Sequence, residues 1–294
     1  MKGYLAAIFI FLITSVSAQH NSSYSQYMFN GLLLNPAYAG SHEALNLTAL
    51  YRKQWLGIEG APTTINFTAH MPLKKKKAAF GMVVANDKFG ISDNTLFHID
   101  YAYRIKAGKG ILSLGLLAGI EILQTNWNQV RTTQIKDPSF TGNAQRFISP
   151  RAGAGIYFYA QKFYLGLSAP SILNTRLSLT NYQLLLFNTG CVLNSSRNFK
   201  IKPAVLVKYL LNSPLDANLS TTFYWKDYIG VGFGYSLNNT GFVLVDAKVN
   251  DQFRIGYGYD YSFSELRNYS TGSHEVILRY LFQYKIQVPS IRYF

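Results

Sequence analysis

In Thr64-Ile65-Asn66-Phe67-Thr68-Ala69-His70-Met71, apolar and polar residues alternate without a break, and this alternation is the clearest indication of the fold class. Successive side chains of a strand point to opposite faces, so one face here is apolar and the other is polar. In a helix, residues two apart point to different sides, and the two sets would be mixed. The stretch therefore predicts a β-strand that lies between an apolar and a polar environment.

The same alternation recurs along the chain. Segment 111–122 carries most of its leucines and isoleucines on one face, and segment 252–261 alternates mainly aromatic residues with glycine and charged residues. Fourteen segments follow this pattern: 44–52, 63–71, 78–86, 94–104, 111–122, 151–160, 163–170, 182–193, 200–209, 215–225, 228–236, 241–249, 252–261 and 273–284.

The connections between these segments fall into two classes. Those after even-numbered segments are mostly tight, whereas several after odd-numbered segments are long, notably 123–150, 171–181 and 262–272. Short periplasmic turns that alternate with longer outer loops are typical of outer-membrane barrels. We therefore predict an all-β fold, a transmembrane antiparallel β-barrel of about 14 strands with a short ordered N-terminal segment. A soluble β-sandwich would expose fewer aromatic residues and leave edge strands to protect.

The composition agrees with a membrane barrel. Hydrophobic residues make up 48% and aromatic residues 15% of the chain, yet the mean hydropathy is only +0.03. Charged residues are 14%, against about 25% in an ordinary soluble domain. Many aromatic residues, few charges and no long apolar run are expected where apolar and polar residues alternate.

The first residues predict export. Lys2 supplies a positive charge, residues 5–13 form a short apolar core, and Val16-Ser17-Ala18 places small residues at a cleavage site. We expect cleavage after Ala18, with Gln19 as the mature N-terminus. The expected organisation is a signal peptide (1–18), an N-terminal segment packed on or in the barrel (19–43), the outer-membrane barrel (44–284) and a C-terminal tail (285–294).

The formal charge of +14 raises the question of a nucleic-acid partner. The signal peptide and the even spread of the basic residues disfavour that partner, so we expect a basic lumen or contact with anionic outer-membrane lipid. The run Lys74-Lys75-Lys76-Lys77 is expected in a tight periplasmic turn, either solvated or holding anionic lipid or a periplasmic partner. Cys191 is the single cysteine, so no internal disulfide is possible.

Catalytic and cofactor motifs are weak in this sequence. His98 and Asp100 share a strand face, and Glu121 is expected nearby, which would suit a barrel hydrolase, but a network of satisfied polar groups in the lumen explains them as well. The histidines show no metal-ligand spacing, and no glycine-rich phosphate loop is present. We therefore expect no enzyme activity and no cofactor. Small residues on inward faces, such as Gly153, Gly155 and Gly232, predict a lumen occupied by the N-terminal segment or a client, or relief of strain where the sheet bends.

Several blocks of sequence resemble one protein family. The first is Tyr24-Ser25-Gln26-Tyr27-Met28-Phe29-Asn30 followed by Leu34-Asn35-Pro36-Ala37-Tyr38-Ala39-Gly40-Ser41, and the second is the stretch from Tyr51 to Thr64. Further blocks follow in order at 166–170, 256–261 and 272–275. Together they resemble the PorP/SprF family, over nearly the whole mature chain.

The resemblance implies a component of the type IX secretion machinery, which exports surface adhesins and enzymes and supports gliding motility. It implies two kinds of partner, the periplasmic lipoprotein ring of that machine and the C-terminal secretion domain of a large adhesin. The alternative function is an uptake channel for a small apolar or anionic solute, which should conduct in planar bilayers.

Two sets of residues are candidates for partner binding. Arg52, Trp55 and Glu59 are expected in a loop punctuated by glycines, where an aromatic residue between opposite charges suits a protein contact. Trp55 is equally well explained as a residue of the aromatic belt at the membrane edge. The second set belongs to the N-terminal segment, which we expect to be ordered because its aromatic residues need burial: Tyr27, Phe29, Asn35, Pro36 and Tyr38.

Overall fold

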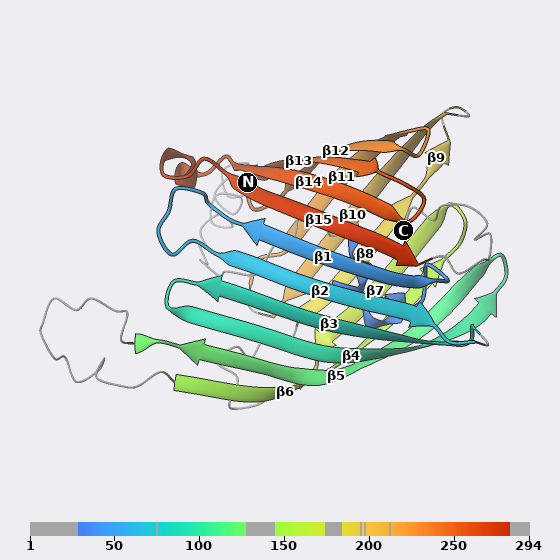
Figure 1. The fold of residues 1–294 in the computed structure, drawn as a ribbon, viewed down its shortest axis with the longest axis horizontal. Coiled ribbons are helices and arrows are strands. Elements are labelled where there is room, and N and C mark those ends of the chain that lie inside the picture. The colour runs from blue at the N-terminus through green and yellow to red at the C-terminus, as the bar shows by residue number, and fades with distance from the viewer. Residues whose placement is uncertain are drawn as a thin grey trace, which may run out of the picture.

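A computed structural model describes residues 29–74, 76–127, 145–173, 184–194, 196, 198–211 and 213–282. These residues form one antiparallel sheet of fourteen long strands and the two-residue strand β9 (Figure 1). The strands are β1 (Leu45–Lys53), β2 (Thr63–Pro72), β3 (Ala78–Phe89), β4 (Ser92–Ala107), β5 (Gly110–Thr125), β6 (Gln145–Tyr159), β7 (Phe163–Ser171), β8 (Leu184–Cys191), β9 (Leu193–Asn194), β10 (Phe199–Leu210), β11 (Asp216–Trp225), β12 (Ile229–Ser236), β13 (Thr240–Lys248), β14 (Phe253–Ser262) and β15 (Ser273–Phe282).

The sheet closes on itself. Each long strand pairs with the next long strand, and the last one, β15, returns to β1, where Arg52 lies opposite Glu275. β10 pairs with both β8 and β11, so no long strand has a free edge among the described residues. A closed barrel satisfies the backbone polar groups that a bilayer cannot hydrate. The predicted barrel of about 14 strands is confirmed.

The two faces of the wall follow the predicted alternation. In β2, Ile65 and Phe67 are 53% and 38% exposed on the outside, while Asn66 and Thr68 are buried on the inside. The same holds for β14, where Tyr257 is exposed and Asp260 is buried. The large apolar side chains of this protein therefore face outward toward lipid, and the buried face is polar.

The strand bounds differ from the prediction in places. β4 and β5 continue past the expected ends of 104 and 122, and β6 begins at Gln145 rather than 151. The expected strand 182–193 is interrupted at Val192, where the pairing of β8 with β10 stops and β9 resumes it. Pro203 lies opposite this break and has no N–H to donate, which explains the interruption. Residues 182–183 and 283–284 of the expected strands lie outside the described residues.

The two ends of the barrel differ in the length of their connections. We call one end the short-turn rim; its connections are 73–77, 108–109, 160–162, 195–198, 226–228 and 249–252. The other end, the long-loop rim, includes the loops 54–62 and 263–272, and β5 and β7 end there. Strand β1 begins and β15 ends at the short-turn rim. In the described part of the chain, no helix is long and apolar enough to cross a membrane.

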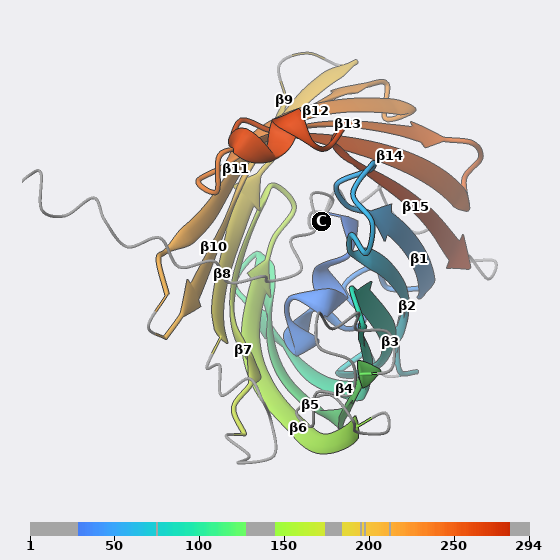
Figure 2. The same cartoon turned by 90° about the vertical axis from the view of Figure 1, so that its left-hand side faces the viewer.

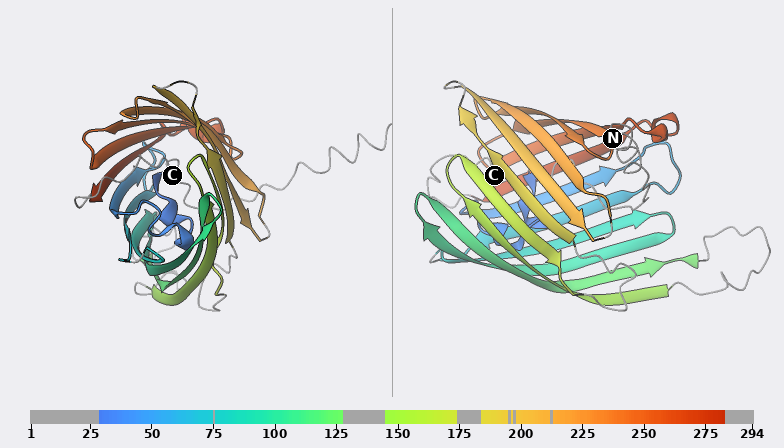
Figure 3. Two further views of the ribbon diagram at one scale, coloured as in Figure 1. Left: turned by 90° about the vertical axis from the view of Figure 1, so that its right-hand side faces the viewer. Right: turned by 180° about the vertical axis from the view of Figure 1, so that it is seen from behind.

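Two short 3-10 helices precede the barrel: η2 (Gly31–Leu33) and η3 (Pro36–Tyr38). Seen from the long-loop rim in Figure 2 and from the short-turn rim in Figure 3 (left), they lie inside the ring of strands. A third, η6 (Glu265–Asn268), lies in the loop 263–272.

Candidate functional site

The N-terminal segment, residues 29–43, fills part of the lumen. Its apolar side chains are almost fully buried, with Leu32 at 1% and Tyr38 at 5% exposure. Burial of each such side chain contributes roughly 2 kcal/mol relative to exposure. The segment contacts the inner wall at β3, β4, β5 and β6, so it is part of the folded barrel.

Asn35 and Pro36 set the conformation of this segment. The Asn35 side chain accepts a hydrogen bond from the Ala37 N–H (2.9 Å) and caps η3, while Pro36 occupies the first helical position. The Asn35 amide group also donates to the backbone carbonyls of Ile156 (3.0 Å) and Leu167 (3.3 Å) on β6 and β7. One side chain thus both shapes the turn and attaches it to the wall.

Glycines in the wall make room for this segment. A Cβ added at Gly115 would lie 2.1 Å from the backbone N of Ala37, and one at Gly155 would lie 2.1 Å from Asn35 Oδ1. The occupied-lumen interpretation therefore fits Gly155. Gly153 and Gly232 face neighbouring strands instead, and Gly115 was not singled out from the sequence.

Tyr38 is the centre of an aromatic cluster. Its ring lies 5.4 Å from the rings of His70 and Tyr157 and 5.7 Å from that of His42, each at a steep interplanar angle. Burial raises the pKa of the Tyr38 phenol, so it remains a neutral hydrogen-bonding group. Gly40 follows in the left-handed region (φ +73°) and donates its N–H to His70 Nδ1 (3.1 Å).

Polar contacts hold the start of the segment. Asn30 accepts a hydrogen bond from Thr68 Oγ1 (3.1 Å), and the Arg279 guanidinium donates to the Phe29 carbonyl and lies 5.6 Å from the centre of the Phe29 ring. The structure thus brings Phe29, Asn35, Pro36 and Tyr38 together in the lumen. Tyr27 lies outside the described residues.

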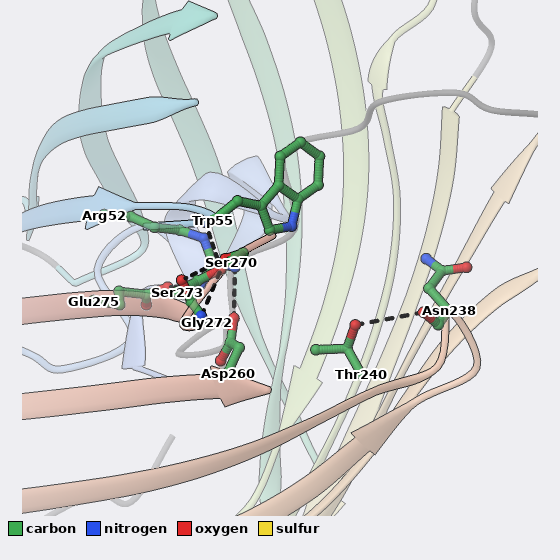
Figure 4. Close-up of polar contacts among 9 residues, drawn as sticks. All are labelled: Arg52, Trp55, Asn238, Thr240, Asp260, Ser270, Gly272, Ser273 and Glu275. Atoms are coloured by element: carbon green, nitrogen blue, oxygen red, sulfur yellow. Dashed lines mark hydrogen bonds and ion pairs between the residues drawn. The ribbon is translucent and has the colours of Figure 1, made fainter. Parts of the chain in front are cut away.

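The expected position of Arg52 in a loop is wrong. Arg52 belongs to β1 and points into the lumen, where it donates to Asp260 (2.5 Å) and Glu275 (2.7 Å) (Figure 4). All three side chains are buried. The alternation along β1 places Arg52 on the same inward face as Thr48, and that signal outweighs the proximity of Arg52 to the glycine-rich loop. Sequence reasoning did not identify Asp260 and Glu275 as its partners.

Trp55 and Glu59 do lie in the loop 54–62 of the long-loop rim. Glu59 is exposed, and Trp55 is half-buried with its backbone in the left-handed region (φ +47°), which is uncommon for a bulky residue and often marks a functional position. The backbone N–H of Trp55 donates to Ser273 Oγ (3.2 Å). Figure 4 shows the indole ring of Trp55 turned away from Ser273 and Asp260.

Backbone hydrogen bonds join this loop to its neighbours. The Leu56 N–H donates to the Gly272 carbonyl (2.8 Å), and the Thr271 N–H donates back to the Leu56 carbonyl (2.9 Å). On the other side, the Gly90 N–H donates to the Gly60 carbonyl (2.8 Å). We call loops 54–62 and 263–272 together the loop platform. Its exposed apolar side chains are Leu56, Phe263 and Tyr269, the last with 76% of its surface exposed.

The polar residues considered for catalysis have structural partners. His98 Nδ1 lies 3.1 Å from Asp100 Oδ1 on the inner face of β4. Glu121 instead accepts from Asn94 (2.8 Å) and lies 3.7 Å from Arg151. Among the described residues, no group of three or more His, Cys, Asp or Glu side chains is placed to hold a metal ion.

Comparison with solved structures shows the same fold. The outer membrane protein Omp33 of Acinetobacter baumannii is similar with a TM-score of 0.52 and 7% identity, over 82% of this chain and 98% of that one. A deletion mutant of the TodX monoaromatic hydrocarbon channel (TM-score 0.47, 7% identity, 87% and 92% coverage) and the KdgM porin (0.37, 8%, 81% and 99%) are less similar. No curated protein sequence matches the chain.

The family is shown by a sequence model. Residues 16–280 match the model of the type IX secretion system membrane protein PorP/SprF, which spans nearly all of the barrel. A closed barrel with an apolar outer face is the form in which proteins cross the bacterial outer membrane, and this is the location of the chain. The chain belongs to the PorP/SprF family and is an outer-membrane component of the type IX secretion system.

Proposed function

We propose that this barrel is a non-enzymatic docking component of type IX secretion. It engages the C-terminal domain of a secreted surface adhesin at the long-loop rim and the periplasmic lipoprotein ring at the short-turn rim. In this way it supports export, surface attachment or gliding, without conducting a solute.

The observation that carries this proposal is the occupation of the lumen by the chain's own N-terminal segment. Asn35 is hydrogen-bonded to two strands of the wall, and Tyr38 is packed between side chains of β2 and β6. A channel needs a continuous water-filled path, whereas a docking protein needs a rigid body with an accessible surface. The buried segment therefore favours a docking protein over an uptake channel.

The loop platform supplies the accessible surface. Exposed apolar residues clustered at a rim and held by backbone hydrogen bonds are typical of protein contacts. Trp55 and Glu59 belong to the same loop of this platform as Leu56, and we propose that they touch the partner. Arg52 acts beneath the platform by fixing β1 to β14 and β15. The lumen is kept filled by Phe29, Asn35, Pro36 and Tyr38, and we propose the same role for Tyr27.

Substitution of Trp55 tests the proposal. Trp55→Ala should leave the barrel folded, as seen from its altered gel mobility without boiling, but reduce retention of the partner and the amount of adhesin on the cell surface. Truncation of a central aromatic residue typically costs roughly 2 kcal/mol or more, about a 30-fold loss of affinity.

Trp225 is the control because it is a tryptophan on the opposite rim, at the end of β11, where its side chain is 54% exposed. Trp225→Ala should slightly destabilise the barrel and spare export. Normal export with a weakened barrel in Trp55→Ala would show that Trp55 is only a belt residue and end the contact hypothesis.

A further inference from the structure

The short-turn rim carries a concentration of exposed lysines. They lie in four of its connections and at the ends of the strands beside them. We call this set the lysine collar: Lys74, Lys76, Lys77, Lys106, Lys109, Lys162 and Lys226.

Few carboxylates of this rim are left to neutralise the collar. Glu43 lies 3.3 Å from Lys76, but Asp227 and Asp251 pair with Lys200 (2.8 Å) and Lys248 (2.6 Å), which are outside the collar. Within the described part of the chain, the ion pairs of this rim therefore leave most of the collar without a negative partner.

The opposite rim has a different charge pattern. Exposed residues there include Glu59 and Glu265 as well as Lys88 and Arg267, so positive and negative charges are mixed. The collar is therefore a feature of one end of the barrel and does not simply reflect the net charge of +14. A segregated patch of one sign indicates an oppositely charged ligand.

Aromatic residues on the outer face set the height of the collar relative to the membrane. The Lys226 ammonium lies 5.0 Å from the centre of the Trp225 ring, and exposed Tyr103 lies on the outer face of β4, three residues before Lys106. Tyrosine and tryptophan lie at the level of the lipid head groups. Lysines just beyond them reach the phosphates of the same lipids.

The collar is densest where the connections 73–77 and 108–109 meet. β3 and β4 pair directly, and the Arg104 N–H donates to the Lys77 carbonyl (2.6 Å), which holds the two turns side by side. Five collar lysines lie in this sector: Lys74, Lys76, Lys77, Lys106 and Lys109.

The spread of the collar around the rim favours lipid over a protein partner. Lys162 and Lys226 lie in the turns β6–β7 and β11–β12, away from the dense sector along the order of strands. A protein that approached from one side would meet one sector, whereas the surrounding leaflet meets all of them. We propose that the lysine collar binds the phosphate groups of anionic phospholipids in the leaflet around the short-turn rim, with the tightest site at turns 73–77 and 108–109.

Selective lipid binding by the full-length folded barrel tests this inference. The protein in an uncharged detergent is mixed with equal amounts of phosphatidylglycerol and phosphatidylethanolamine, and the bound lipids are counted by native mass spectrometry. The collar variant is Lys74→Gln/Lys77→Gln/Lys109→Gln, and the control is Lys88→Gln/Arg146→Gln/Arg267→Gln, which removes three exposed cations from the opposite rim.

We expect the wild type to bind phosphatidylglycerol in preference to phosphatidylethanolamine. The preference of the collar variant should be more than tenfold lower, because each basic residue near an anionic surface raises the affinity by a factor of about five. The control should keep its preference, and both variants should retain heat-modifiable mobility. If the triple collar variant does not fold, Lys74→Gln and Lys109→Gln are measured separately, each with a loss of about fivefold expected.

Four results would overturn the inference. The wild type could bind both lipids equally, or the control could lose as much selectivity as the collar variant. Inorganic phosphate could also displace the lipid at millimolar concentration, which would indicate a free-anion site. A collar variant that keeps its lipid preference but no longer retains a periplasmic protein would likewise show that the collar binds protein.

Discussion

Arg52 is the residue whose environment departs most from the sequence-based expectation. Its guanidinium lies between the carboxylates of Asp260 and Glu275, at 2.5 Å and 2.7 Å, and all three are buried in the lumen. Removal of one member of a buried ion pair leaves an uncompensated charge, which costs far more than the pair contributes. The three residues come from β1, β14 and β15, so they stabilise the junction where the first and last strands close the barrel.

Arg52→Met should therefore destabilise the barrel strongly. We expect a loss of about 3–5 kcal/mol in the free energy of unfolding, measured by urea titration in detergent micelles with gel mobility as the readout. Lys53→Met is the control, because Lys53 is the next residue along β1 on the outer face and makes its hydrogen bonds to the neighbouring strand and loop. Asp260→Asn/Glu275→Gln in the Arg52→Met background should recover part of the loss. A stability of Arg52→Met equal to that of wild type would contradict the structural role of this cluster.

Arg52 was expected in a loop, although the alternation along its strand indicates the direction in which such a residue points; what these residues touch has no signal in the sequence. Alternation with a period of two places Arg52, Asp260 and Glu275 on inward faces of their strands. Their mutual contact depends on the register of β1 with β15 and of β14 with β15, which is set by closure of the whole ring. Arg52 and Glu275 are 223 positions apart in the sequence, so no local sequence pattern indicates that they are partners. The loop residues Trp55 and Glu59 were placed correctly because Gly57, Gly60 and Pro62 end the strand pattern locally.

At the scale of elements, the N-terminal segment is held by shape as well as by hydrogen bonds. Gly115 and Gly155 lie opposite each other on β5 and β6 and bring the wall against Ala37 and Asn35. Glycine has no Cβ, so only glycine at these two positions lets the N-terminal segment approach the wall this closely.

Gly115→Ala should loosen the segment from the lumen. The added Cβ would lie 2.1 Å from the Ala37 backbone N, so the segment must shift or leave. We expect chymotrypsin to cut at Tyr38 at least about tenfold faster in the folded barrel, which corresponds to about 1.4 kcal/mol in the opening equilibrium. Gly232→Ala is the matched control on β12, where the nearest atom is the Thr222 hydroxyl at 3.0 Å. Unchanged protection in Gly115→Ala, or equal exposure in both variants, would show that the segment is not held in this way.

The elements differ in how well the sequence predicted them. Strands with uninterrupted alternation, such as β2 and β14, were predicted within one residue of their ends. The break at Val192 was missed because it depends on Pro203, which lies on a different strand. The aromatic residues of the N-terminal segment predicted that it adopts a defined structure. Its 3-10 turns and its contacts with Gly115 were not predicted, because they depend on the shape of the lumen.

For the whole molecule, we propose that the closed wall and its buried internal segment make a plugged barrel. The wall is continuous through the β15–β1 and β10–β11 pairings, and the segment is packed against both β2–β5 and β6–β7. In a plugged barrel, opening a path through the lumen would require removal of the segment, with loss of the burial of several apolar side chains at roughly 2 kcal/mol each. In the proposed function, the barrel is a rigid support for its rims.

Conductance across a planar lipid bilayer tests the occupied lumen most directly. Full-length protein, inserted and folded, should give little or no stable single-channel current, whereas Gly115→Ala should give frequent openings as the segment leaves. Gly232→Ala should remain as quiet as the wild type. Large, stable conductance in the wild type would contradict a plugged docking component and favour the solute channel.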